Sequence, residues 1–205
     1  PETDFLKITS PEEIKVCDPA CGSGHMLTYS FDLLYAIYEE AGYDAVSIPT
    51  LIVKNNLYGI ELDQRAGELS AFALTMKARG KHKRFFRDPI QPNICVLENI
   101  KFKTEELNEY IDEVGRDLFT APLRTTLTQF EESDNFGSLI QPALEDVDGI
   151  RETLHSKDLS GNLFLKATHD QVLKVLHQAD YLRQKYHVVV ANPPYMGGKS
   201  MNGRL

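Results

Sequence analysis

The sequence contains few cysteines, no long apolar run and no excess of basic residues, and each shortage excludes a class of protein. The three cysteines form an odd set with no further cysteine or histidine at zinc-ligand spacing, so we expect neither a disulfide framework nor a metal site. No apolar run reaches the length of a membrane span, and no basic start leads into an apolar signal segment. We therefore expect a soluble, cytoplasmic protein with reduced thiols.

The charge balance argues against a free-standing nucleic-acid binder. The chain has 30 acidic and 22 basic residues, which makes its formal net charge −8. Because Lys and Arg contacts to phosphates supply most non-specific affinity, any contact with DNA must be local or come from residues outside this sequence. The 205 residues, 42% of them hydrophobic, are enough for one core of ordinary size in one or two domains. The start at Pro1 suggests a section of a longer protein.

Strand and helix patterns alternate along the first half of the chain. A short strand is predicted at residues 15–18 and a helix at residues 25–42. A second strand follows at residues 56–63, then a helix at residues 65–80 and a third strand at residues 93–97. The apolar side chains expected to face the core are Leu27, Phe31, Leu34 and Tyr38 in the first helix and Ala66, Leu69, Phe72, Ala73 and Met76 in the second.

A fourth strand is predicted at residues 187–191, where an unbroken β-branched run is typical of a strand covered on both faces. The alternation predicts an α/β fold, a doubly wound, mostly parallel sheet with right-handed crossovers and helices on both faces. Residues 101–186 are too long for an ordinary crossover, and helical patterns begin there at Thr104 and near His169. We expect a helical insertion at residues 101–186, between core residues 1–100 and 187–205.

A glycine turn, DPACGSG, lies where the first strand leads into the first helix. Ligands meet the strand ends of doubly wound folds at this place. Gly22 and Gly24 permit unusual dihedral angles and let a ligand approach the backbone. The candidate cofactor-binding residues of this turn are Asp18, Pro19, Ala20, Cys21, Gly22, Ser23 and Gly24. A plain strand-to-helix turn capped by Asp18 is the alternative.

The residue types in and after this turn separate three kinds of cofactor. A dinucleotide site prefers a third glycine where Leu27 stands, and the Asp18 carboxylate would repel a pyrophosphate. The same carboxylate suits a ligand with ammonium and sulfonium groups, such as S-adenosylmethionine. No Gly-Lys-Ser/Thr sequence follows, which disfavours a phosphate-binding NTPase loop. S-adenosylmethionine is therefore the expected cofactor.

Acidic and amide residues follow the next two predicted strands. Glu61, with Leu62 beside it, ends the second strand, where an acid can accept both hydroxyls of a ribose. Glu98 or Asn99 follows the third strand and could bond an adenine amino group, with Ile100 against the ring. The alternatives are a solvated charge for Glu61 and ordinary loop sequence for the other two residues.

The fourth strand ends in Asn-Pro-Pro-Tyr, which suits methylation of an amino group conjugated to a ring or carbonyl. The lone pair of such a nitrogen is delocalised, so acceptors on its two N–H bonds must stabilise the developing positive charge. The Asn192 side-chain oxygen and the Pro193 carbonyl can be these acceptors, while Pro194 restricts the backbone. Tyr195 offers a face on which a planar group can stack. These four residues are the candidate catalytic residues.

Together, DPACGSG, GIELD and ANPPY resemble the cofactor, ribose and catalytic motifs of amino-group DNA methyltransferases, in the order of the adenine-N6 class. PACGSG resembles the large bacterial restriction-modification enzymes, and NPPYMGGKSMN is similar to the methyltransferase of BREX-type phage-defence systems. The resemblance covers the core strands and leaves residues 101–186 almost without a match.

This resemblance implies that the turn from Asp18 to Gly24 holds the methionine part of S-adenosylmethionine, that Glu61 holds its ribose, and that Glu98 or Asn99 holds its adenine. The substrate would be double-stranded DNA with an adenine flipped out of the helix, in a bacterial cytoplasm and with other defence-system subunits as partners. Two alternatives stay open, a methyltransferase for protein glutamine or RNA, which can use the same quartet, and a scaffold without catalytic activity.

Overall fold

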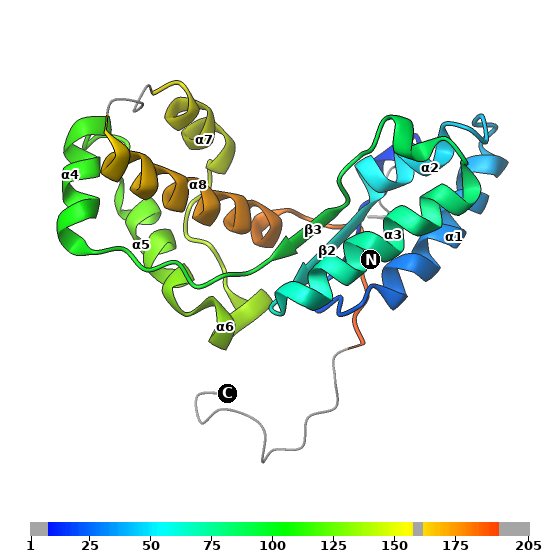
Figure 1. Ribbon diagram of the computed structural model, residues 1–205, viewed down its shortest axis with the longest axis horizontal. Coiled ribbons are helices and arrows are strands. Elements are labelled where there is room, and N and C mark those ends of the chain that lie inside the picture. The colour runs from blue at the N-terminus through cyan, green and yellow to red at the C-terminus, as the bar shows by residue number, and fades with distance from the viewer. Residues whose placement is uncertain (1–7, 158–161, 193–205) are drawn as a thin grey trace, which may run out of the picture. The chain divides into compact units, whose positions relative to one another are not determined.

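The computed structural model describes residues 8–157 and 162–192 (Figure 1). The chain divides into two compact units. The described part of the first unit is residues 8–96 and 185–192, and that of the second is residues 97–157 and 162–184. The second unit therefore overlaps the predicted helical insertion. None of the helices in the described ranges is long and apolar enough to cross a membrane.

The first unit is built on a four-stranded sheet with the order β3-β2-β1-β4. Its strands are β1 (Val16–Asp18), β2 (Leu57–Glu61), β3 (Asn93–Val96) and β4 (Val188–Val189). Every neighbouring pair in this sheet is parallel. The predicted α/β class with a parallel sheet is thus confirmed. Short 3-10 helices at Pro11–Glu13 and Phe85–Arg87 precede β1 and β3 in the sequence.

Helix α1 (His25–Glu40) connects β1 to β2, and α3 (Gln64–Lys81) connects β2 to β3. Right-handed crossovers that step in one direction along a sheet place both helices on the same face. The core confirms this placement, because Leu27 of α1 and Leu74 of α3 belong to one buried cluster with Val16 and Leu57. Figure 1 shows the two helices side by side.

The predicted inner face of α1 is correct. Its four predicted core residues are buried together with Tyr35. The chain then passes Gly42, which has a φ of 81°, to α2 (Ile48–Leu51) and a π-helix at Ile52–Asn56. The fully buried Asn56 accepts a hydrogen bond from the Tyr38 hydroxyl at 2.9 Å and donates to the carbonyls of Pro11 and Ile14, both at 2.7 Å. These bonds attach the start of the unit to the base of β2.

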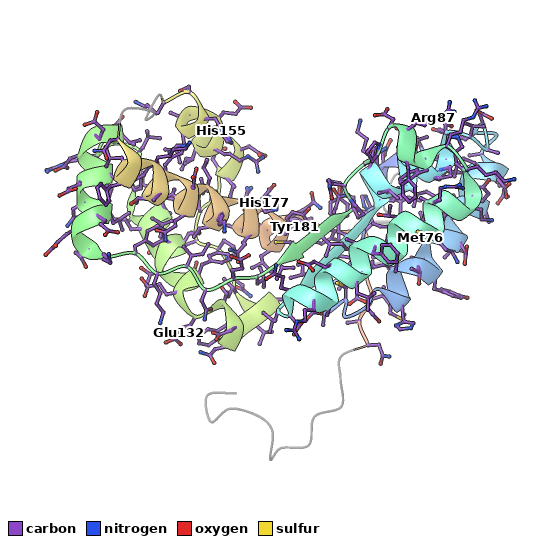
Figure 2. All side chains as sticks on the ribbon, in the orientation of Figure 1. Met76, Arg87, Glu132, His155, His177 and Tyr181 are labelled. Carbon is purple, nitrogen blue, oxygen red and sulfur yellow. The ribbon has the colours of Figure 1, made fainter. Side chains whose placement is uncertain are left out.

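The predicted inner face of α3 is wrong. Leu69, Phe72 and Met76 are 52%, 61% and 45% exposed, and Met76 is labelled in Figure 2. Ala66 and Ala73 are half-buried. The buried residues of the helix are instead Gly67, Ser70, Leu74 and Ala78.

The reason is that α3 lies very close to its neighbours. A Cβ atom at Gly67 would lie 2.6 Å from Val96 Cγ2, and a Cβ atom at Gly24 would lie 2.6 Å from Ser70 Oγ. Only small residues fit at these contacts, so Gly67 and Ser70 stand there. Of the larger apolar residues of α3, Leu74 is buried, whereas Leu69, Phe72 and Met76 are exposed. The prediction of the inner face of α3 from hydrophobicity alone was therefore wrong.

The prediction that the fourth strand is covered on both faces is also wrong for the described residues. Val188 and Val189 are 47% and 63% exposed. Within the described ranges β4 pairs with β1 alone, so it is an edge strand of two residues. A β-branched run favours a strand but does not specify its place in the sheet.

The second unit is helical. Its helices are α4 (Thr104–Val114), α5 (Ala121–Gln129), α6 (Ser133–Phe136), α7 (Val147–His155) and α8 (Leu163–Arg183), with 3-10 turns at Phe130–Glu132 and Gly137–Leu139. The predicted helix start at Thr104 is confirmed, and the helix predicted near His169 begins six residues earlier. Helix α8 packs against α4, α5 and α7 (Figure 1), and the buried Tyr110 hydroxyl lies 2.7 Å from His169 Nδ1. Burial lowers the pKa of His169.

The corrected face of α3 can be tested by two substitutions. Leu74→Ala should lower the free energy of unfolding by about 2–5 kcal/mol, because it leaves a cavity in the core. Phe72→Gln should change it by less than about 0.5 kcal/mol, because this side chain is exposed. Urea unfolding curves measure both. Equal losses for the two variants would contradict the described orientation of the helix.

Candidate functional site

The glycine turn and Glu61 meet at one edge of the sheet. Strands β1 and β2 are parallel neighbours, and Asp18, the last residue of β1, pairs with Gly59 of β2. The turn is joined to the end of β2 by two hydrogen bonds, from Cys21 N–H to the Ile60 carbonyl at 3.0 Å and from Gly22 N–H to Glu61 Oε2 at 2.7 Å. The glycine turn and the end of β2, which are far apart in the sequence, therefore lie together at one candidate site.

The two glycines of the turn have different roles. Both have positive φ, 51° for Gly22 and 82° for Gly24. A Cβ atom at Gly22 would meet nothing within 4 Å, so the backbone there faces open space. Gly24 instead packs against Ser70 of α3. Only Gly22 thus offers the approach to the backbone that was expected of both, and Ser70 is a packing partner that sequence reasoning missed.

Residues on either side of Gly24 complete the turn. The side chain of Ser23 lies with its Oγ atom 2.9 Å from Nδ1 of His25, the first residue of α1. The Gly24 N–H donates to the Cys21 carbonyl at 2.8 Å. Cys21 is buried, and burial raises the pKa of its thiol to about 11. Cys17 and Cys95 are also buried.

Asp18 is an acid in a buried position. It is 2% exposed, and its Oδ1 atom accepts a hydrogen bond from Ala20 N–H at 3.1 Å. Burial raises the pKa of Asp18, the bond from Ala20 lowers it, and the negative charge of Glu61 raises it further. Two acidic side chains close together make this place more favourable for a cationic ligand than for an anionic one.

Glu61 is not the freely solvated charge of the alternative interpretation. Besides the bond from Gly22, its Oε1 atom accepts hydrogen bonds from the N–H groups of Leu62 at 2.8 Å and Asp63 at 3.1 Å. Asp63 caps α3 by accepting a bond from Ala66 N–H at 2.9 Å. The Leu62 side chain is 45% exposed and provides an apolar surface next to the carboxylate.

Glu98 and Asn99 follow β3 and belong to the second unit. The Glu98 N–H donates to Gln178 Oε1 at 2.9 Å, and its carboxylate lies 3.5 Å from Lys174 Nζ. Asn99 Oδ1 accepts a hydrogen bond from Asp134 N–H at 2.9 Å. Both residues thus have partners within the helical unit, and their contact with an adenine stays a prediction.

Asn192 follows the strand on the other side of β1. The pairs of β1 with β4 are Val16 with Val188 and Cys17 with Val189, and Val190 N–H donates to the Cys17 carbonyl at 2.9 Å. Since the strands are parallel, the chain leaves β4 at the same edge at which β1 leads into the glycine turn. Asn192 is exposed there. The other three catalytic candidates, Pro193, Pro194 and Tyr195, lie outside the described residues.

A parallel sheet with a glycine turn after its first strand and an acid after its second is the arrangement of Rossmann-like methyltransferase cores. Residues 55–204 match the family described as "Eco57I restriction-modification methylase", and residues 7–91 match "MmeI, DNA-methyltransferase domain". The chain belongs to the Eco57I restriction-modification methylase family. This confirms the family resemblance drawn from the three motifs.

Two curated proteins are similar to almost the whole chain. The family match at residues 55–204 also includes residues 101–186, so the expectation that the resemblance leaves these residues almost without a match is wrong. The "adenine-specific methyltransferase BrxX" of Escherichia coli O9:H4 (strain HS) is 38% identical over 95% of this chain and 18% of its own length. The "adenine-specific methyltransferase PglX" of Lacticaseibacillus casei (strain Zhang) is 32% identical over 93% of this chain and 16% of its own length. The chain therefore spans less than a fifth of either relative.

The buried Asp18 predicts a stability that depends on pH. Its pKa is raised above the ordinary value of 3.8, so its stabilising contribution is complete below that pH and is lost as the pH rises through the raised pKa. Asp18→Asn keeps an acceptor for Ala20 and cannot ionise. The variant should therefore unfold at a higher temperature than the wild type at pH 7, and the difference should vanish towards pH 3.8.

Thermal unfolding of both proteins across this pH range measures the effect. The control is Asp63→Asn, which removes an exposed carboxylate at the same edge of the sheet. An equal gain in the control would show that net charge is responsible, and would contradict the argument from burial.

Proposed function

We propose that the protein containing this chain transfers a methyl group to the N6 amino group of adenine in double-stranded DNA, as part of a restriction-modification or phage-defence system. One observation carries this proposal: β1 is hydrogen-bonded to β2 and β4, so the glycine turn, Glu61 and Asn192 all come after strands that end at one edge of the sheet. The family of the chain and the names of its two relatives support the reaction and the substrate.

The residues at this edge fit S-adenosylmethionine as the methyl donor. Gly22 leaves open space beside its backbone, where a side chain would stand in any other residue. Asp18 and Glu61 supply negative charge that the ammonium and sulfonium groups of this cofactor neutralise. Glu61 and Leu62 would hold the ribose side, and the assignment of the adenine to Glu98 or Asn99 rests on the motif order alone. When bound, S-adenosylmethionine supplies an electrophilic methyl group.

Asn192 would act on the target base. Its side-chain oxygen can accept a hydrogen bond from the N6 amino group and so stabilise the positive charge that develops on nitrogen. The Pro193 carbonyl would accept the second bond, Pro194 would restrict the backbone, and Tyr195 would stack on the ring; these three roles rest on the motif. The base must leave the DNA helix to reach them, because N6 is otherwise paired.

Asn192→Ala tests the catalytic part of the proposal. In the complete protein it should lower kcat for methyl transfer to duplex DNA by about 100-fold to 1000-fold, the usual loss when one donor or acceptor of a transition-state site is removed. Affinity for S-adenosylmethionine should change less than about twofold. Transfer of a labelled methyl group, with mass spectrometry of the DNA bases, measures the rate, and calorimetry measures the affinity.

The control for this experiment is Val189→Ala, which truncates an exposed side chain on the same strand. It should retain activity. Normal methyl transfer by Asn192→Ala, or a label that enters protein or RNA in place of DNA, would contradict the proposal.

Gly22→Ala tests the cofactor part. Gly22 and Gly42 both have positive φ and open space around a Cβ position, so alanine costs each about 1–2 kcal/mol of backbone strain. Only Gly22 lies at the proposed site, so Gly22→Ala should weaken S-adenosylmethionine binding roughly tenfold or more, and Gly42→Ala should not. Calorimetry on the complete protein measures both affinities. Equal affinities in the two variants would place the cofactor elsewhere.

A further inference from the structure

The Glu61 carboxylate accepts three hydrogen bonds from the backbone of its own chain. Oε2 accepts from Gly22, and Oε1 accepts from Leu62 and Asp63. An ionised carboxylate offers about four acceptor positions. Glu61 therefore has about one position left for a ligand, although an acid that binds both hydroxyls of a ribose needs two.

The bond to Gly22 also holds the glycine turn. Gly22 loses more conformational freedom on ordering than any other residue type would, and nothing surrounds its Cβ position to restrain it. Its attachment comes from the 2.7 Å bond to Glu61 and from the neighbouring bond between Cys21 N–H and the Ile60 carbonyl. The first of these depends on a side chain and can be removed by substitution.

We propose that Glu61 is a positioning residue for the glycine turn, which holds the Gly22 N–H before a cofactor binds and leaves one acceptor position for one ribose hydroxyl. The turn part of this inference stands on the contacts of the unit alone. The ribose part rests on the proposed function, because it assumes that a nucleoside cofactor binds at this edge.

The chemistry of the side chain distinguishes this role from that of a simple ribose acceptor. Glutamine at position 61 would have one acceptor oxygen, so it could bond Gly22 or the Leu62 and Asp63 pair, but not both. Aspartate keeps the charge but is shorter by one methylene, so its carboxylate cannot span the same two groups of donors. Glu61→Gln and Glu61→Asp should each lose one of the two groups of bonds, whereas Glu61→Ala loses both and should release the turn. Asp63→Asn removes a neighbouring charge and keeps the cap of α3.

Amide hydrogen exchange of the complete protein without cofactor tests the turn. A bond to a charged acceptor contributes enough that Glu61→Ala should speed exchange at Gly22 at least about tenfold. Asp63→Asn should leave it unchanged. Exchange at Thr28, whose N–H donates to the Gly24 carbonyl at 2.8 Å, should stay slow in all variants and so show that α1 is folded. Unchanged exchange at Gly22 in Glu61→Ala overturns the proposal.

Binding of S-adenosylhomocysteine, measured by calorimetry, tests the ribose part. Glu61→Gln should weaken binding about tenfold or more, and in methyl transfer it should raise KM for S-adenosylmethionine while kcat changes less than about twofold, as expected for an interaction made equally in the ground and transition states. A loss confined to kcat overturns the ribose part. If the wild type binds no S-adenosylhomocysteine, the proposed function and the ribose part fail together, and the exchange at Gly22 still decides the turn.

Discussion

The parallel hydrogen bonding of β1 to strands on both of its sides determines where the candidate side chains lie. β1 has three residues, and it pairs with β2 through Val16, Cys17 and Asp18 and with β4 through the first two of these. Because all three strands point the same way, the segments after their carboxyl ends emerge at one edge of the sheet. Gly22 and Glu61, which lie 39 positions apart in the sequence, can then form a hydrogen bond of 2.7 Å.

Close packing around this sheet sets a second constraint. A side chain at Gly59 would come within 2.6 Å of Ile94 Cδ1 and 2.9 Å of Cys21 Sγ, and side chains at Gly24 and Gly67 would be equally crowded. The small residues thus let α1 and α3 approach the strands and let the turn lie directly on β2. At these close contacts α3 has Gly67 and Ser70, and of its larger apolar side chains Leu74 is buried while Leu69, Phe72 and Met76 are exposed.

Much of this fold could be predicted from the sequence, because the features concerned are local. The strands and the buried face of α1 depend on periodicity within one segment, and the cap at Asp63 depends on the four residues from Asp63 to Ala66. The inner face of α3 and the place of β4 at the edge of the sheet, as far as the described residues form it, could not be predicted, because each depends on distances to other elements. The hydrogen bond from Gly22 to Glu61 could not be predicted either. An acid after the second strand indicates a ligand contact, and the sequence around it does not show whether it also bonds the glycine turn.

The electrostatics of the site show that an ionised Asp18 lowers the stability of this fold. Burial and the charge of Glu61 both disfavour its ionised form, and one bond from Ala20 offsets them only in part. A neutral residue of the same shape would fit the fold at a lower cost in stability. In the proposed function a cationic ligand lies beside Asp18 and pairs with its negative charge. Binding of the ligand then removes the destabilisation that the unpaired, buried charge causes, and this relief favours binding. A site of this kind gains affinity and selectivity for a sulfonium ligand from the same charge that destabilises the fold on its own.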